Sequence, residues 1–399
     1  MSDAAPRRLY LDNAATSFPK PPEVLAAMTD YATRLGASAG RGAYDEAVET
    51  GRLLEACRRE INDFIGGESP DHVVFALNCS DALNIALRGL IDPFNPGHVV
   101  ISEADHNSIL RPVHAMAEQW GLKFTAVPCD PETTLVDPAD VREAIQRDTK
   151  FVALTHASNV TGAVQRVAEI GAICREMAVP FVVDAAQSIG HVSVDVQKDS
   201  IDLLAAPGHK ALMGPLGTGF LYLRPGMEKL VRPLREGGTG SRSDLPTHPT
   251  WMPDRYEPGS HNAIGVAGLL AGVRWLRGKG LGEIQRHEQG LVSTFLGAIT
   301  GVDGLTLFGP PGVADRIGVF SVRAEGLEPH ELSAALESGF GVLSRSGIHC
   351  APWVHRAIGT LDAGGATRLS FGPFTSKQDV RFAADALAEL TSSAELMAV

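Results

Sequence analysis

The chain has 399 residues, of which 44% are hydrophobic and 21% charged, and these proportions are ordinary for a globular protein. Its length predicts two domains, with a core large enough to enclose a dry active site. The formal net charge is -12, and the absence of any run of about five like charges argues against nucleic acid or an anionic membrane as a partner. No stretch approaches the roughly 18 apolar residues of a membrane span, and the N-terminus lacks a signal-peptide pattern.

The cysteines are irregularly spaced, and no two of them form a C-x-x-C pair. This pattern predicts neither a metal site nor a disulfide framework, and it favours reduced thiols in a cytoplasmic protein. The residues concerned are Cys57, Cys79, Cys129, Cys174 and Cys350.

From about residue 70 to residue 225, short apolar runs alternate with segments whose apolar positions recur every three or four residues. Strands and helices that alternate at this spacing predict a mainly parallel sheet with helices on both faces. The apolar runs lie at 73–76, 98–102, 151–155, 180–184, 202–206 and 219–223.

The chain changes character after this region. Residues 227–262 are irregular and rich in Gly, Pro and Ser, which is typical of a functional or interfacial loop. A long helical stretch follows at 263–300, and a second set of strands and helices comes after it. We therefore expect a large domain over 16–262 and a smaller C-terminal α/β domain over 263–399, with residues 1–15 packing near the smaller one.

Five successive apolar runs end in polar residues. These ends are 78–81, 103–106, 156–159, 184–187 and 207–210. In parallel sheets, ligands bind beyond the carboxyl ends of the strands, so the five polar ends are expected to converge on one cleft. Because five in succession is unusual, the sequence predicts a functional site there.

Lys210 and Asp184 give this site its chemistry. A lysine amine in a low-polarity site is a nucleophile that forms Schiff bases with aldehyde cofactors. Pyridoxal phosphate (PLP) also needs a carboxylate facing its pyridine nitrogen, because the protonated ring is the electron sink. Lys210 and Asp184 fit these two requirements; the alternatives are a solvated loop lysine and a helix N-cap.

Further strand-end residues fit the same cofactor. Cys79 and Ser80 lie at the start of an expected helical segment. Their backbone N–H groups and the Ser80 hydroxyl suit a phosphate, although a serine at a helix start is commonly only an N-cap. His106 suits stacking on the ring and proton transfer, or else a structural role. Asn159 and Gln187 are able to hydrogen-bond a ring hydroxyl, or else they are loop and cap residues.

Several segments together closely resemble the class V aminotransferase family of fold-type I PLP enzymes, in particular the cysteine desulfurases. The resemblance implies a large domain with a mainly parallel seven-stranded sheet and a smaller C-terminal α/β domain. The segments that carry it are 10–28, 158–165, 182–196, 208–223, 345–360 and 367–380.

The resemblance assigns a role to each strand-end residue. It implies that Lys210 holds the cofactor, that Asp184 faces the pyridine nitrogen and that His106 covers the ring. It also implies that Gln187 and Asn159 contact the ring hydroxyl. The phosphate is expected to be bound by Ser80 and His209.

Cys350 is the residue that points to sulfur chemistry. It lies in a short polar loop at 344–350, where Arg345 and His349 are expected to favour the thiolate. Its position matches the persulfide-forming cysteine of the second group of desulfurases, whereas Cys57 and Cys174 are interpreted as small buried hydrophobes.

Three further residues are expected at the substrate. Arg368 matches the arginine that binds the substrate carboxylate, and a guanidinium suits a carboxylate bidentately. Asn13 and Arg345 are the other residues expected to bind the substrate.

Two positions depart from the family pattern. Pro207 stands where many relatives have a hydroxyl residue that binds phosphate, and Cys79 replaces a common small or hydroxyl residue. Phosphate binding is then expected to depend on backbone amides, Ser80, His209 and Ser260. In the family the segment of Ser260 reaches across a dimer interface, so we expect a homodimer with active sites near that interface.

The expected reaction converts L-cysteine to L-alanine and leaves a persulfide on Cys350, for transfer to a sulfur-acceptor protein. One alternative is another class V PLP reaction, catalysed by an aminotransferase, an epimerase, a selenocysteine lyase or a C–S lyase. The other alternative is a non-catalytic scaffold, which would bind no cofactor.

Overall fold

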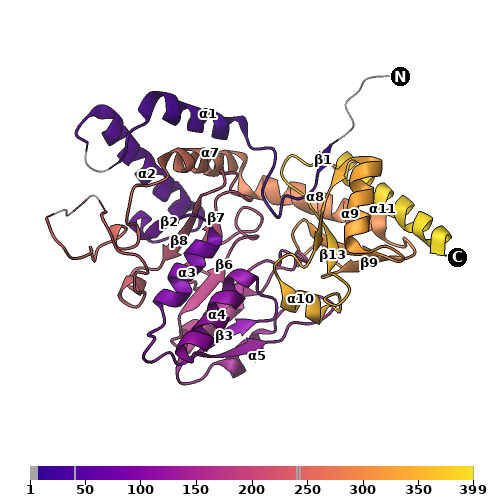
Figure 1. Ribbon diagram of the computed structural model, residues 1–399, viewed down its shortest axis with the longest axis horizontal. Helices are drawn as coiled ribbons and strands as arrows, with labels where there is room; N and C mark the ends of the chain where they lie inside the picture. The colour runs from indigo at the N-terminus through magenta and orange to yellow at the C-terminus, as the bar shows by residue number, and fades with distance from the viewer. Residues whose placement is uncertain (1–7, 40–41, 240, 242–243, 399) are drawn as a thin grey trace.

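The computed structural model describes residues 8–39, 42–239, 241 and 244–398. Two α/β units lie side by side, and the C-terminal third of the chain forms the smaller one (Figure 1). In the described part of the chain, no helix is long and apolar enough to cross a membrane.

The large unit is built on a seven-stranded sheet of order β2-β8-β7-β6-β5-β3-β4. The strands from β7 to β4 in this order are parallel, and β8 runs antiparallel to both of its neighbours. The predicted mainly parallel sheet is therefore confirmed. The strands are β2 (Val73–Ala76), β3 (His98–Ser102), β4 (Lys123–Val127), β5 (Thr149–Thr155), β6 (Phe181–Asp184), β7 (Leu203–Pro207) and β8 (Gly219–Leu223).

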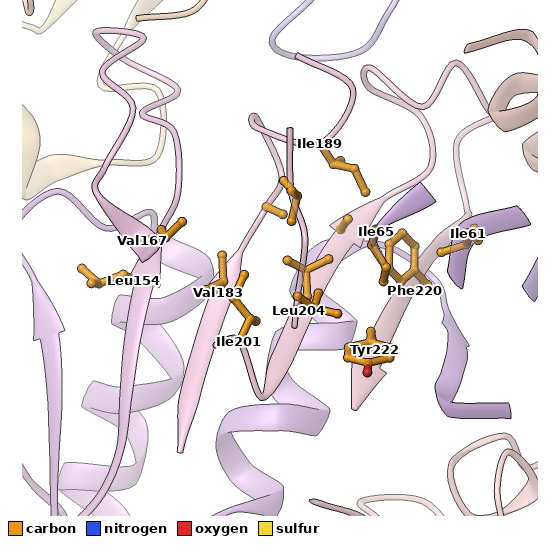
Figure 2. Packing of buried hydrophobic residues seen from close by; sticks show 14 of the residues in the cluster. Ile61, Ile65, Leu154, Val167, Val183, Ile189, Ile201, Leu204, Phe220 and Tyr222 are labelled. Carbon is orange, nitrogen blue, oxygen red and sulfur yellow. The ribbon is translucent and has the colours of Figure 1, made fainter. Parts of the chain in front are cut away.

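Helices cover both faces of this sheet because alternate residues of each strand point to opposite sides. In β5, Val152 and Leu154 face one core, whereas Phe151 and Ala153 face the other. Figure 2 shows part of the first core, with side chains from the strands and from α2. That core is covered by α2 (Asp45–Phe64), α5 (Pro138–Ala144), α6 (Val167–Glu176) and α7 (Ala263–Lys279), and the second by α3 (Cys79–Gly89) and α4 (Asn107–Trp120).

The long helical stretch expected at 263–300 is two helices. Gly280, with a positive φ of 83°, separates α7 from α8 (Leu281–Ile299). The buried side chains of α7 belong to a core of the large sheet, and those of α8 belong to the core of the small unit. The packing therefore favours Gly280 as the division between the two units.

The small unit is a four-stranded antiparallel sheet, β12-β13-β10-β9, packed against three helices. The N-terminal strand β1 (Leu9–Tyr10) joins it by parallel pairing with β11 (Val342–Leu343). Residues 1–7, which are also expected near this unit, lie outside the described residues. Its other elements are β9 (Leu305–Phe308), β10 (Val319–Ala324), α9 (Pro329–Phe340), β12 (Arg345–Gly347), α10 (Pro352–Ala357), β13 (Ala366–Ser370) and α11 (Lys377–Ala398).

The irregular segment between β8 and α7 is anchored by a buried ion pair. Glu257 accepts hydrogen bonds from both terminal nitrogens of Arg58 and from the N–H of Phe75, and it pairs with His261 at 2.7 Å. Both partners of the Arg58–Glu257 pair are buried, so the segment around Ser260 is held against the large unit. The remaining short helices are α1 (Pro22–Asp30), η1 (Tyr31–Leu35), η2 (Pro70–His72), η3 (Met227–Lys229) and η4 (Asp254–Tyr256).

Candidate active site

A cavity of about 550 Å³ lies beyond the carboxyl ends of the central strands, beside the first turns of α3 and α4. Residues from all five polar strand ends were expected to meet, and the structure brings eight of the predicted site residues to the cavity lining. These are Cys79, Ser80, His106, Asn159, Asp184, Gln187, His209 and Lys210.

Asp184 ends β6 and is buried at the cavity wall. Its Oδ1 accepts hydrogen bonds from the N–H of Ala186 at 2.9 Å and from Sγ of Cys79 at 3.3 Å. Burial raises the pKa of Asp184 above its ordinary value, and the Ala186 amide, the nearby Lys210 and the Cys79 thiol offset only part of this rise. Because both hydrogen bonds fall on Oδ1, Oδ2 is left to accept from a further donor such as a pyridinium N–H.

Lys210 lies on the turn after β7, at the same cavity. Burial lowers the pKa of its ammonium group, and Asp184 opposes this shift. A lowered pKa makes the neutral, nucleophilic amine more accessible, which is the state that condenses with an aldehyde.

The N-terminal segment fixes the main chain of this turn. Ser17 Oγ donates to the carbonyl oxygen of Lys210 at 2.7 Å, and Lys20 Nζ donates to the carbonyl oxygen of His209 at 2.7 Å. Burial lowers the pKa of Lys20 to about 8. Sequence patterns did not identify these contacts, because about 190 residues separate the partners.

His106 has a defined tautomer. Its Nδ1 accepts a hydrogen bond from the backbone N–H of Ser108 at 3.0 Å, so the proton of the neutral ring lies on Nε2. Burial, followed by the charges of Lys210 and Arg368, lowers the pKa of His106 to about 3. The ring is therefore neutral at physiological pH, with one N–H donor.

The start of α3 and His209 together offer donors to an anion. The first-turn amides of Cys79 and Ser80 make no hydrogen bond to the described residues. His209 Nδ1 is buried and also has no partner among them. Free N–H groups at a helix start beside a buried imidazole suit a phosphate group, so the residues present fit PLP at this end as Asp184 does at the other.

The Cys350 loop is tied to the rim of this cavity. The carbonyl oxygen of Cys350 accepts from the N–H of Asn107 at 2.8 Å, and that of His349 accepts from Asn159 Nδ2 at 2.5 Å. Cys350 is exposed, and both it and His349 have positive φ angles, of 58° and 52°. For non-glycine residues this left-handed conformation is uncommon and is often found at functional sites.

The expected help from His349 to a thiolate is corrected by the structure. Burial lowers the pKa of His349 to about 2, so its imidazole is neutral at physiological pH and places no positive charge beside Cys350. Of the two neighbours proposed to stabilise a thiolate, only Arg345 carries a charge.

Arg368 lies behind the cavity wall. It is 1% exposed, its Nη2 pairs with Asp12 Oδ1 at 2.7 Å, and its Nη1 donates to the carbonyl oxygen of Asn159 at 3.1 Å. Its Nε is buried without a partner among the described residues, so the guanidinium keeps free N–H groups for a carboxylate.

The other residues expected at the substrate lie near Arg368. Arg345 is its cross-strand partner, and Asn13 Nδ2 donates to the carbonyl oxygen of Ser370. Neither Arg345 nor Asn13 is part of the cavity lining, and Arg368 reaches that lining only through Asn159.

Ser260 is exposed and does not line this cavity. It lies in a neighbouring surface groove, which shares Leu77 and Gly217 with the cavity lining. Its position does not place it at the phosphate end of its own chain. In the described part of the chain, no group of three or more His, Cys, Asp or Glu residues is able to hold a metal ion.

Some lining residues escaped the sequence analysis. Thr155, Ser108 and Leu216 line the cavity, and Ser108 Oγ links Ser80 Oγ at 2.6 Å to His106 Nδ1 at 2.9 Å. Thr155 is the last residue of β5 and gave the same strand-end signal as its neighbours. Ser108 lies inside a helix start, where its contact with Ser80 depends on the packing of two helices.

Comparison with known proteins agrees with this geometry. The Aminotransferase class-V family model matches residues 9–382. The chain is 34% identical over 386 residues to the probable cysteine desulfurase of Methanothermobacter thermautotrophicus, covering 96% of this chain and 94% of that protein. It is 36% identical over 391 residues to the probable cysteine desulfurase of Pyrococcus abyssi, covering 96% and 94%.

A solved structure gives the same result. The apo structure of cysteine desulfurase from Thermococcus onnurineus NA1 matches with a TM-score of 0.89 at 34% identity, covering 97% of this chain and 95% of that one. The chain therefore belongs to the class V aminotransferase family, and the predicted fold-type I architecture is confirmed.

Proposed function

We propose that this chain is a PLP-dependent cysteine desulfurase, which converts L-cysteine to L-alanine and leaves a persulfide on Cys350. The observation that carries the proposal is an exposed cysteine held at the rim of a cavity that is lined by Lys210 and the buried Asp184. Full-length relatives named as cysteine desulfurases, at 34% and 36% identity, support it.

Different residues of the cavity would bind different parts of the cofactor. Lys210 would bind its aldehyde covalently, Asp184 Oδ2 would accept from its pyridine nitrogen, and the amides of Cys79 and Ser80 with His209 would hold its phosphate. Gln187 also lines the cavity; its Nε2 donates to the Ala14 carbonyl oxygen, which leaves its amide oxygen for the ring hydroxyl. When bound, PLP supplies an electron sink for negative charge at the substrate Cα.

Protein groups then move the protons and fix the substrate. The Lys210 amine takes the proton from the substrate Cα, and His106 is placed to exchange a proton through Nε2. Free N–H groups of the Arg368 guanidinium bind the substrate carboxylate. Orienting the substrate sulfur toward Cys350 in this way contributes up to about 7–11 kcal/mol in the most favourable cases.

The sulfur step balances within the active site. The Cys350 thiolate forms an S–S bond with the substrate sulfur as the substrate C–S bond breaks. The electron pair of that C–S bond stays with carbon, which takes up a proton and leaves as part of alanine. The sulfur remains on Cys350 as a persulfide, ready for a thiol of an acceptor protein.

We also propose that the protein is a homodimer in the cytoplasm. Leu77 and Leu216 at the cavity are 58% and 69% exposed, and a second copy would cover these apolar side chains. Such a copy would also bring Ser260 near the phosphate end. All five cysteines are unpaired, which supports a reducing compartment.

Alanine and sulfide released from L-cysteine test the proposal, with a reductant present to regenerate Cys350. We expect wild type to form both products and Cys350→Ala to lose at least roughly a hundredfold in rate, because the attacking thiol is gone. Cys174→Ala, at a buried cysteine outside the cavity, is the matched control and should retain the wild-type rate.

A second variant separates cofactor attachment from sulfur chemistry. Lys210→Ala should lose the visible absorbance of the lysine-bound cofactor, whereas Cys350→Ala should keep it. Full alanine formation by Cys350→Ala would overturn the proposed persulfide on Cys350, whereas a wild type that binds PLP but forms no alanine from L-cysteine would leave another class V reaction. Absence of cofactor binding in wild type would leave the scaffold alternative.

A further inference from the structure

The thiol of Cys79 is the one feature of the cofactor site that departs from the family pattern and also contacts the central carboxylate. Cys79 is the first residue of α3, and only 7% of its surface is exposed. Its Sγ lies 3.3 Å from Asp184 Oδ1, across 105 residues of sequence. A buried cysteine commonly serves only as a small apolar side chain, so the direction of this contact decides its role.

The contact has the geometry of a hydrogen bond from the thiol to the carboxylate. A carboxylate that faces a protonated pyridine nitrogen only accepts, so in the PLP-bound site the hydrogen of the pair would belong to sulfur and point toward Oδ1. Asp184 is buried, and a buried carboxylate remains ionised only where donors and positive charges surround it. The donors to Asp184 among the described residues are the Ala186 amide and the Cys79 thiol, both on Oδ1.

Cys79 also contributes its backbone N–H to the proposed phosphate end of the site. The N–H of Cys79 belongs to the free first turn of α3, which is where the phosphate would bind. Its side chain reaches the carboxylate that would face the pyridine nitrogen. One residue therefore links the start of α3 to Asp184, and PLP would be held between these two groups.

We propose that Cys79 is a positioning residue that acts through Asp184. Its thiol donates to Oδ1, which orients the carboxylate with Oδ2 toward the pyridine nitrogen and keeps the carboxylate ionised, so that the ring nitrogen stays protonated. This inference rests on the proposed binding of PLP. It does not depend on the later sulfur step at Cys350.

Two substitutions isolate the donor. Cys79→Ala removes the hydrogen-bonding group and adds no bulk to the cavity, whereas Cys79→Ser keeps a donor of similar size. Cys174→Ala and Cys174→Ser are the matched control variants. They report the effect of replacing a buried cysteine elsewhere, since Cys174 lies on α6 outside the cavity. Thermal unfolding of all four apoproteins reports any general loss of stability.

The deciding measurements are made on the cofactor. The PLP dissociation constant is measured by fluorescence quenching of the apoprotein, and the protonation of the pyridine nitrogen by the ¹⁵N NMR shift of labelled PLP. We expect Cys79→Ala to weaken PLP binding roughly three- to tenfold and to move the ¹⁵N shift toward that of the unprotonated ring. Cys79→Ser should keep the wild-type shift, and both Cys174 variants should match wild type.

Either of two results would overturn the proposal. One is a Cys79→Ala protein with the wild-type ¹⁵N shift and an unchanged dissociation constant. The other is an equal loss in Cys79→Ala and Cys79→Ser, which would show that the hydrogen-bond donor has no role. Failure of wild type to bind PLP would instead refute the proposed function, and it is visible without any variant.

Discussion

The histidines around the cavity are neutral, so the positive charge of the site comes from other residues. Burial lowers the pKa of His106 to about 3, of His209 to about 4 and of His349 to about 2. At physiological pH these imidazoles therefore add no positive charge, and an anion is attracted by the free amides at the start of α3 and by the guanidinium groups of Arg368 and Arg345. We assign the substrate carboxylate to Arg368, because its Nε has no partner among the described residues.

Replacing Arg368 by lysine tests this assignment. A lysine keeps the charge but cannot present two parallel N–H groups, so we expect Arg368→Lys to raise the KM for L-cysteine roughly ten- to a hundredfold, with a smaller change in kcat. Steady-state alanine formation gives both constants. Arg323→Lys, on the neighbouring strand β10 and outside the site, is the control and should leave KM unchanged. An unchanged KM in Arg368→Lys would contradict the role.

At the scale of the elements, the apolar strands of the large sheet were predictable, including the edge strand β2, whereas the more polar edge strand β4 was not. Apolar runs predicted six strands of the large sheet, because a strand covered on both faces is apolar along its whole length. The edge strand β4 escaped notice, since Lys123 at its start is exposed and its next residues are only half-buried. Gly280 was also missed, because helical periodicity continues on both sides of it.

The same contrast holds for the candidate site. Lys210, Asp184 and the other strand-end residues were predictable because parallel strands bring their carboxyl ends to one edge. The Cys79–Asp184 contact and the clamp of Ser17 on Lys210 were not predictable. Each depends on how segments that are distant in sequence pack together, which no local pattern encodes.

The Arg58–Glu257 pair that anchors the 257–262 segment gives a stability prediction. Burial alone would raise the pKa of Glu257, but Arg58 and His261 outweigh it and lower the pKa to about 2. We expect Glu257→Gln to destabilise the fold by about 3–5 kcal/mol near neutral pH, because it leaves Arg58 as an uncompensated buried charge. Glu176→Gln, which breaks the exposed pair with Arg142, should cost less than about 1 kcal/mol.

The sign of the pH dependence follows from the lowered pKa. Stability from Glu257 is fully present above the pKa of an unfolded glutamate, about 4.5, and is lost as pH falls toward about 2. Urea unfolding across this acid range should show a steeper loss in wild type than in Glu257→Gln. Parallel curves for the two proteins would refute the prediction.

At the scale of the whole molecule, several contacts hold the small unit to the large one, and two of them involve the N-terminal segment and α8. The N-terminal segment pairs Asp12 with Arg368 on β13, and it also clamps the turn of Lys210 through Ser17. In the second connection, Glu288 on α8 pairs with His191 Nδ1 at 2.8 Å, in the loop after β6. The groups proposed to bind substrate and cofactor are therefore fixed relative to each other by contacts between the units.

The His191–Glu288 pair makes this connection sensitive to pH. Burial alone would lower the pKa of His191, but Glu288 outweighs it and the pKa is raised. The stability from this pair is thus fully present below the pKa of an unfolded histidine, about 6.5, and is lost as pH rises through the higher pKa of the folded state. We expect Glu288→Gln to lower the thermal midpoint more at about pH 6 than at about pH 9. An equal decrease at both pH values would contradict the assignment.

If Cys350 carries the proposed persulfide, the tethering of its loop limits how the sulfur reaches an acceptor. Hydrogen bonds from Asn107 and Asn159 hold the main chain at Cys350 and His349, so the sulfur moves mainly by rotation about one side-chain bond. That rotation displaces Sγ by roughly 3 Å at most. A new S–S bond is only about 2 Å long, so an acceptor thiol has to enter the rim itself. Because the Cys350 side chain reaches only a short distance, we expect the proposed acceptor to carry its thiol on a protruding, accessible loop.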